Sequence, residues 1–198
     1  MLKSLVVEAF VLRLALLLAL ATGTGNALAS PIYHVALDTT SLAGQHAWLD
    51  FLFTGLDNAA PAQATVTGFT ADTGGVTLAE GDVSGSLASA LVIGNGSGWN
   101  EYGQWLQLGG LLEFDVAFDL GPAGAGTSLV VTLLDDRFGY LAGTGDLVTF
   151  ALQPGAGTAV SADSAFAAVS AIPEPGSLAV LGTGLLLMMA TRRFGRRR

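Results

Sequence analysis

The chain has 198 residues, of which 51% are hydrophobic, and it contains no cysteine. Residues 30–172 hold fourteen acidic residues and one base, Arg137, so their formal charge is −13. This balance excludes nucleic-acid binding, which needs cations to neutralise phosphates, and the lack of cysteine excludes thiolate catalysis, disulfides and zinc–thiolate sites.

The first 29 residues are predicted to be a signal peptide. Basic residues precede an uninterrupted apolar stretch, residues 14–21, and the small residues Ala27 and Ala29 then lie just before Ser30. This order is typical of a secretory signal that signal peptidase cuts after Ala29. An uncleaved anchor is the alternative, although the apolar stretch is short for a membrane span.

Residues 30–160 are predicted to form an all-β exported domain. Short apolar runs alternate with Gly, Asn, Asp and Ser turns, and almost no stretch has helical spacing. This pattern favours a two-sheet antiparallel sandwich, jelly-roll-like, flanked by the signal peptide and by one C-terminal transmembrane helix. The expected strands are 33–38, 47–53, 64–70, 76–78, 87–93, 105–108, 111–120, 128–134 and 147–152. Residues 161–172 are small and rich in Ala and Ser, which predicts a linker.

Alternation along these strands predicts which side chains fill the core. The residues expected to be buried are Leu49, Phe51, Phe114, Val116, Phe118, Leu129, Val131 and Leu133.

Three carboxylates, Glu113, Asp115 and Asp119, share the polar face of residues 111–120. Such a row could contribute oxygens to a Ca²⁺ site, which takes about six to eight of them, but no Asp-x-Asp-x-Asp-Gly loop supports one. A solvated polar face is the alternative, and no metal ligand or cofactor is assigned. Asp135 to Arg137 is interpreted first as a turn.

Aromatic residues give the one indication of a binding surface. Trp99, Tyr102 and Trp105 lie within seven residues, among glycines, amides and a carboxylate. A pyranose ring stacks on aromatic faces while its hydroxyls need hydrogen-bonding groups, so these three residues are candidate glycan contacts. The competing interpretation is that some of these rings plug one end of the sandwich.

No catalytic residue is assigned, and the protein is not expected to be an enzyme. Gly-x-Ser-x-Gly does not occur in the domain, so no serine has the setting of a nucleophile elbow. A glycosidase pair could be drawn from Glu80, Glu101 and Glu113, but the sequence singles out no two of them.

The last 26 residues have three parts in a fixed order. Pro173, Glu174 and Pro175 force extended backbone before an uncharged apolar run, residues 176–191. Sixteen helical residues span about 24 Å, a little less than a hydrocarbon core of about 30 Å. The run ends in five arginines that can snorkel to the interface: Arg192, Arg193, Arg196, Arg197 and Arg198. They predict a single transmembrane segment with a cytoplasmic end, which places the domain on the outer side. A plain tail anchor or a short buried helix are the alternatives.

This tail resembles the PEP-CTERM sorting signal of Gram-negative, biofilm-forming bacteria. The resemblance implies that residues 173–198 are recognised by an exosortase, a membrane-embedded cysteine protease or transpeptidase, which processes its substrate near the Pro-Glu-Pro motif. Residues 33–44 and 48–51, and more loosely 100–102 and 112–116, also resemble a group of PEP-CTERM proteins whose exported domain has no established activity. That similarity implies a secreted β-domain without known cofactor or catalytic residues.

Together these features predict a protein exported across the inner membrane, anchored there transiently, and then released to the cell envelope or the extracellular space. Its expected role is a structural or adhesive component of the envelope or of an exopolysaccharide matrix, with exosortase, signal peptidase and exopolysaccharide as partners. The alternatives are a secreted carbohydrate-active enzyme and a calcium-dependent adhesion module.

The tail generates a prediction about processing. The mature protein from its native host should lack the residues beyond the Pro-Glu-Pro motif, which intact-mass measurement would show. Changing Glu174 to Ala should leave the precursor in the inner membrane. Finding Arg198 still attached to the dominant extracellular species would reject processing.

Overall fold

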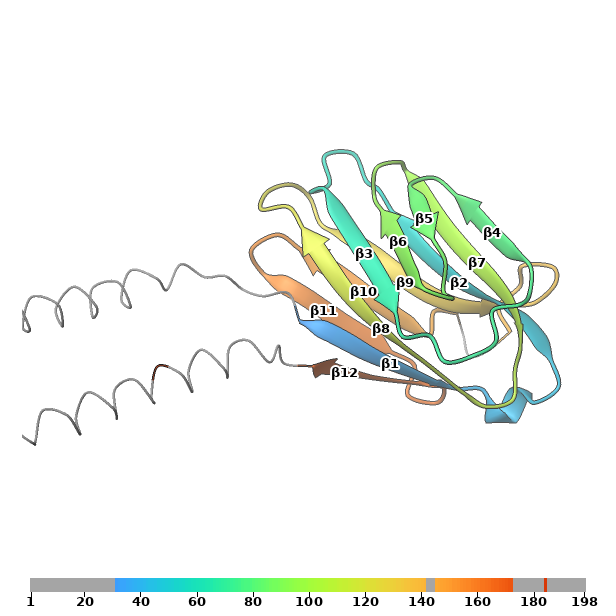
Figure 1. Ribbon diagram of the computed structural model, residues 1–198. Helices are drawn as coiled ribbons and strands as arrows, with labels where there is room; N and C mark the ends of the chain where they lie inside the picture. The colour runs from blue at the N-terminus through green and yellow to red at the C-terminus, as the bar shows by residue number, and fades with distance from the viewer. Residues whose placement is uncertain (1–30, 142–144, 173–183, 185–198) are drawn as a thin grey trace, which may run out of the picture.

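The protein is described by a computed structural model that covers residues 31–141, 145–172 and 184. Its elements are β1 (Ile32–Asp38), the 3₁₀ turn η1 (Thr40–Leu42), β2 (His46–Thr54), β3 (Ala62–Thr67), β4 (Thr77–Glu80), β5 (Val83–Gly85), β6 (Ala90–Gly94), β7 (Trp99–Gln107), β8 (Leu111–Leu120), β9 (Thr127–Leu134), β10 (Val148–Gln153), β11 (Gly157–Ala162) and β12 (Ala167–Ile172). Two antiparallel six-stranded sheets form the two layers of a sandwich (Figure 1). Sheet A has the order β12-β1-β8-β3-β6-β5 and sheet B the order β11-β10-β9-β2-β7-β4. The all-β prediction is confirmed.

The core lies between the two sheets and is filled by alternate residues of each long strand. Along β8 the buried residues are Leu112, Phe114, Val116 and Phe118, while the residues between them face outward. Aromatic rings from both sheets meet in the centre: Phe51 of sheet B packs edge-on against Phe114 of sheet A, with their centroids 5.4 Å apart. All eight side chains that the alternation predicted to be buried are in this core.

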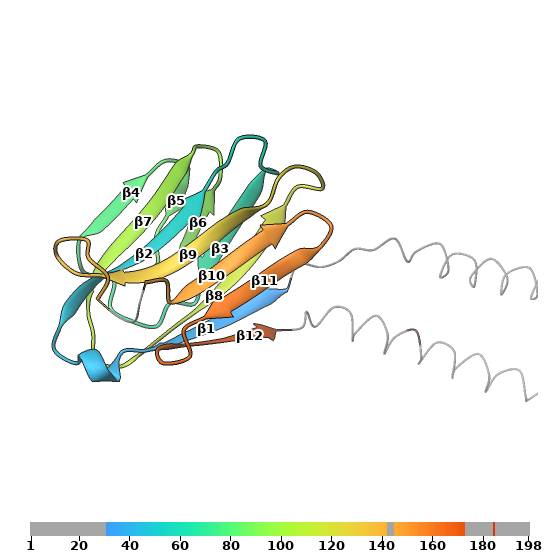
Figure 2. The same cartoon turned by 180° about the vertical axis from the view of Figure 1, so that it is seen from behind.

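The strands pair in a nested order. β1 pairs with β8, β2 with β7 and β3 with β6, so the chain from β1 to β8 behaves as one long ribbon folded back on itself. Successive pairs of this ribbon alternate between sheet A and sheet B. Three later strands extend sheet B beyond β2, and β12 returns to sheet A beside β1 (Figure 2). The first and last strands are therefore neighbours, with Ile32 opposite Ile172.

The predicted linker, residues 161–172, is wrong. Its first two residues end β11, and Ala167–Ile172 form β12, which is paired with β1 along its whole length. Both strands lie at sheet edges and bury little, so their small residues satisfy backbone hydrogen bonds without showing an apolar alternation. For the same reason the three-residue edge strand β5 was not predicted. β12 ends at the residue before Pro173, so no linker separates the folded sheet from the Pro-Glu-Pro motif.

Several predictions from the sequence lie outside the described residues. These are the signal peptide with Ala27, Ala29 and Ser30, the motif Pro173 to Pro175, the apolar run 176–191 taken as a whole, and the five terminal arginines. Within the part of the chain that the structure describes, no helix is long and apolar enough to cross a membrane.

The two faces of β8 generate a prediction about stability. Phe118 is buried and contacts Tyr33 and Phe150, so Phe118→Ala should lower the free energy of unfolding by about 3 to 5 kcal/mol. The neighbouring Ala117 points out of the sandwich, so Ala117→Ser should change it little. Chemical denaturation of both variants measures the difference, and equal losses would contradict the assignment of faces.

Candidate functional site

The outer face of sheet B carries an unusual set of side chains, positioned by the pairing of β2 with β7. The register sets Trp48 opposite Trp105, Asp50 opposite Gly103 and Leu52 opposite Glu101. Side chains alternate between the two faces of a strand. Trp48 and Asp50 therefore share this face with Trp99, Glu101, Gly103 and Trp105 of β7. It therefore holds all three tryptophans of the chain.

Four rings on this face make an aromatic platform, defined as His46, Trp48, Trp105 and Phe138. Trp48 and Trp105 meet edge to face at a centroid distance of 5.2 Å. His46 stacks on Trp105, and Phe138 stacks on Trp48, each nearly parallel at 6.1 Å. Trp48 and Trp105 are half-buried by these contacts, whereas Phe138 is 57% exposed.

A glycine allows the platform to form. A Cβ at position 103 would lie 3.2 Å from the Trp48 ring, which is closer than nearly all such contacts in proteins. Gly103 therefore leaves the space over β7 that the Trp48 ring occupies.

Phe138 is presented by a turn after β9, as expected for residues 135–137. The Asp135 carboxylate accepts hydrogen bonds from the backbone N–H groups of Arg137 and Gly139, both at 2.8 Å. These hydrogen bonds to Gly139 and Arg137 hold the pKa of Asp135 below its usual value. They also fix Phe138 in the left-handed region, at a φ of 62°, which is rare for an aromatic residue.

Carboxyl groups lie beside the platform. The indole Nε1 of Trp99 donates a hydrogen bond of 2.7 Å to Glu101, which fixes that carboxylate on the outer face. Glu80 of β4 stands directly opposite Glu101 in the pairing of β4 with β7. Directly opposed residues have Cβ atoms about 5 Å apart, so these like charges repel one another.

Asp50 is the buried member of this group, with an exposed fraction of 6%. Burial raises the pKa of Asp50 to about 7, and the nearby negative charge of Glu101 and a hydrogen bond with it add to the effect. Thr132 of β9 donates a hydrogen bond of 3.4 Å to the Asp50 carboxylate and opposes this rise in the pKa. A carboxyl with such a pKa is uncommon, and groups of this kind gather at functional sites.

The structure divides the predicted glycan contacts between two faces. Trp99 and Trp105 lie on the outer face, but Tyr102 is 2% exposed and belongs to the core, so its prediction as a surface contact is wrong. The reason is that β7 begins at Trp99, whereas the predicted strand began at Trp105. Residues 99 and 105 therefore point to one face of the strand and residue 102 points to the other.

The amides that were expected to face a sugar are also used inside the protein. Asn100 is fully buried, and its amide nitrogen donates to the carbonyl oxygens of Phe53 and Ser97 at 2.9 and 2.8 Å. Asn95 donates to the carbonyl of Ala60 at 2.8 Å. These amides hold loops together and are not available to a sugar. The polar groups beside the rings include the Glu101 carboxylate and the exposed amide of Gln107, which is paired with His46.

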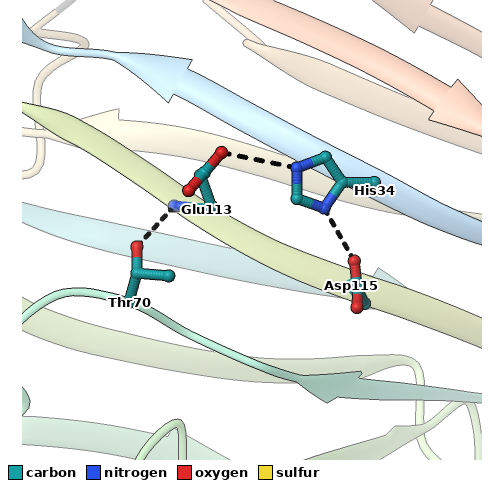
Figure 3. Close-up of polar contacts among 4 residues, drawn as sticks. All are labelled: His34, Thr70, Glu113 and Asp115. Carbon is teal, nitrogen blue, oxygen red and sulfur yellow. Dashed lines mark hydrogen bonds and ion pairs between the residues drawn. The ribbon is translucent and has the colours of Figure 1, made fainter.

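A second polar cluster lies on the outer face of sheet A (Figure 3). Nδ1 of His34 on β1 is 2.8 Å from Asp115, and its Nε2 is 3.5 Å from Glu113, both on β8. The pKa of His34 is raised, chiefly by its hydrogen bond with Asp115. Partial burial lowers it, and the charges of both carboxylates raise it further. Two of the three carboxylates considered for Ca²⁺ are thus joined to a histidine, and the described residues hold no group of three or more His, Asp or Glu suited to a metal ion.

No protein-family model, no curated protein and no solved structure matches the chain. Its function is therefore inferred from its own residues and their geometry. The outer face of sheet B is the stronger candidate site, because it joins exposed rings to a carboxyl that is buried at a cost in stability.

The raised pKa of Asp50 predicts an unusual pH dependence of stability. Below about pH 4 the carboxyl is protonated in the folded and the unfolded chain alike. As the pH rises from about 4 to 7, the unfolded chain releases this proton first, so Asp50 lowers the free energy of unfolding progressively. The free energy of unfolding of Asp50→Asn should therefore exceed that of the wild type by an amount that grows across this range, up to about 4 kcal/mol at pH 7 and above.

Urea denaturation at a series of pH values measures this difference. Glu101→Gln is the matched variant, because removing the charge of Glu101 should lower the pKa of Asp50. In the Glu101→Gln background, the stability difference between Asp50 and Asp50→Asn should therefore be smaller. A constant difference between wild type and Asp50→Asn from pH 4 to 7 would contradict the assignment.

Proposed function

We propose that this protein is an exported PEP-CTERM protein, sorted and processed by an exosortase, that serves as a structural or adhesive component of the cell envelope or exopolysaccharide matrix. The support for its export and sorting is the signal peptide pattern and the three-part tail. The support for a matrix role is the outer face of sheet B.

The observation that carries this role is the placement of the tryptophans. The core contains Phe, Tyr and aliphatic side chains but no tryptophan, whereas the three tryptophans all lie on the outer face of one sheet. Folding alone gives no reason to leave Trp99 51% exposed on that face. Exposed aromatic rings beside fixed polar groups suit the apolar faces and hydroxyl edges of a polysaccharide.

The length of the face also suits a polymer. Trp99 and Trp105 are six residues apart on β7, about 20 Å at the usual rise of a strand. A glycan chain running along β7 would meet Trp99, then the Glu101 carboxylate, then the aromatic platform. The nested pairing of β1 to β8 supports classing the sandwich as jelly-roll-like, an architecture that lectin domains use.

A secreted carbohydrate-active enzyme is the second candidate. Its support is the Asp50–Glu101 pair, in which burial and the nearby charge of Glu101 raise the pKa of Asp50 to about 7. However, Asp50 is buried, with an exposed fraction of 6%, whereas a retaining glycosidase places both carboxyls against the sugar, about 5 to 5.5 Å apart. Release of reducing sugar from host polysaccharide, lost in Asp50→Asn, would favour the enzyme over a passive binder.

The proposed role predicts which residues retard the protein in a polysaccharide gel. Affinity electrophoresis in the host's own purified exopolysaccharide should slow the wild type. Trp48→Ala and Trp105→Ala should each weaken binding about tenfold, because each removes a stacking surface. Leu111→Ala is the control, since it removes an exposed apolar side chain from sheet A. Unchanged wild-type mobility, or full retardation of both folded tryptophan variants, would reject the proposal.

A further inference from the structure

The charge around the aromatic platform limits which glycans it can accept. Within the described residues Arg137 is the only Lys or Arg, and it lies in the turn that carries Phe138. The face itself carries the Glu80 and Glu101 carboxylates next to the rings. A polymer of uronic acids would bring its negative charges against these carboxylates and would be repelled.

Two of these carboxyl groups, Glu80 and Glu101, also repel each other in the free protein. Glu80 and Glu101 oppose each other across two paired strands, and Asp50 is buried next to Glu101. Like charges in this arrangement destabilise a sheet. A cation placed over the face would relieve that repulsion.

We propose that the ligand of this face is an amino-sugar polymer with free, protonated amines, such as an unacetylated glucosamine chain. This inference rests on the proposed function and names the class of glycan. The pyranose rings stack on Trp105 and Trp48, and the ammonium groups lie between Glu101 and Glu80. Trp99 contributes twice, because its indole N–H fixes the Glu101 carboxylate while its exposed ring offers a further stacking surface.

The physical reasons for this choice act together. An ammonium group forms charge-assisted hydrogen bonds with carboxylates and is attracted to the face of a neighbouring indole ring. A neutral hexose would keep the stacking but gain neither of these terms. Binding of the amine polymer should therefore depend on both the rings and the carboxylates, and it should weaken when salt is added.

The test compares two six-residue oligomers with the same sugar backbone, glucosamine hexamer with free amines and N-acetylglucosamine hexamer with acetylated, uncharged amines. The full-length protein in mild detergent is titrated with each oligomer in mildly acidic buffer, where the free amines are protonated. Intrinsic fluorescence reports binding directly, because all three tryptophans lie on this face. The amine hexamer should bind about tenfold more tightly than the acetylated one.

Variants separate local recognition from general attraction. Glu101→Gln should remove most of the preference for the amine hexamer. Asp119→Asn makes the same change of charge on sheet A and should leave the preference unchanged. Trp48→Ala should weaken binding of both hexamers, and thermal unfolding confirms that each variant is folded.

Equal affinity for the two hexamers would overturn the inference, as would absent binding of the amine hexamer or equal effects of Glu101→Gln and Asp119→Asn. If the host exopolysaccharide still retards the protein, these results refute the amino-sugar preference alone. If the exopolysaccharide is not bound either, the proposed function fails with it.

Discussion

The register between β2 and β7 is the constraint on which the candidate site depends. Nine residues of each strand pair without interruption, and this single alignment brings Trp48 to Trp105, Asp50 to Gly103 and Leu52 to Glu101. A shift by one residue would turn every outer side chain into the core. The buried partners of the same strands, such as Phe51 and Tyr102, fix the register from inside. The hydrophobic core therefore determines the chemistry of the outer face.

That outer face is arranged at a cost in stability. Asp50 is buried beside another carboxylate, Glu80 opposes Glu101, and Phe138 is held in a left-handed conformation. Each of these features destabilises the folded chain, while the dense aromatic packing between the sheets offsets them. Their position together, around one pair of tryptophans, supports the proposed role of this face in glycan binding.

The sequence predicted the strands that bury one face and missed three edge strands, β5, β11 and β12. β8 and β9 alternate clearly because every second residue enters the core. In contrast, β11 and β12 are edge strands of small residues, held mainly by backbone hydrogen bonds to one neighbour, so they resembled a linker. The predicted burial of Leu49 and Phe51 also implies that Trp48 and Asp50 point outward, but their meeting with Trp105 and Glu101 comes from a long-range pairing that a single sequence does not show. Tyr102 was misplaced because the strand was predicted to begin at Trp105, six residues after the true start of β7, so residue 102 was not recognised as part of the alternating strand.

The most direct test of the account is to follow the three indole N–H signals of the ¹⁵N-labelled protein while its host's exopolysaccharide is added. Because Trp48, Trp99 and Trp105 all lie on the outer face of sheet B, all three signals should move, whereas amides on the outer face of sheet A should not. Binding that leaves the three indole signals in place, or that shifts the residues around His34 instead, would contradict the assignment of this face as the glycan-binding surface.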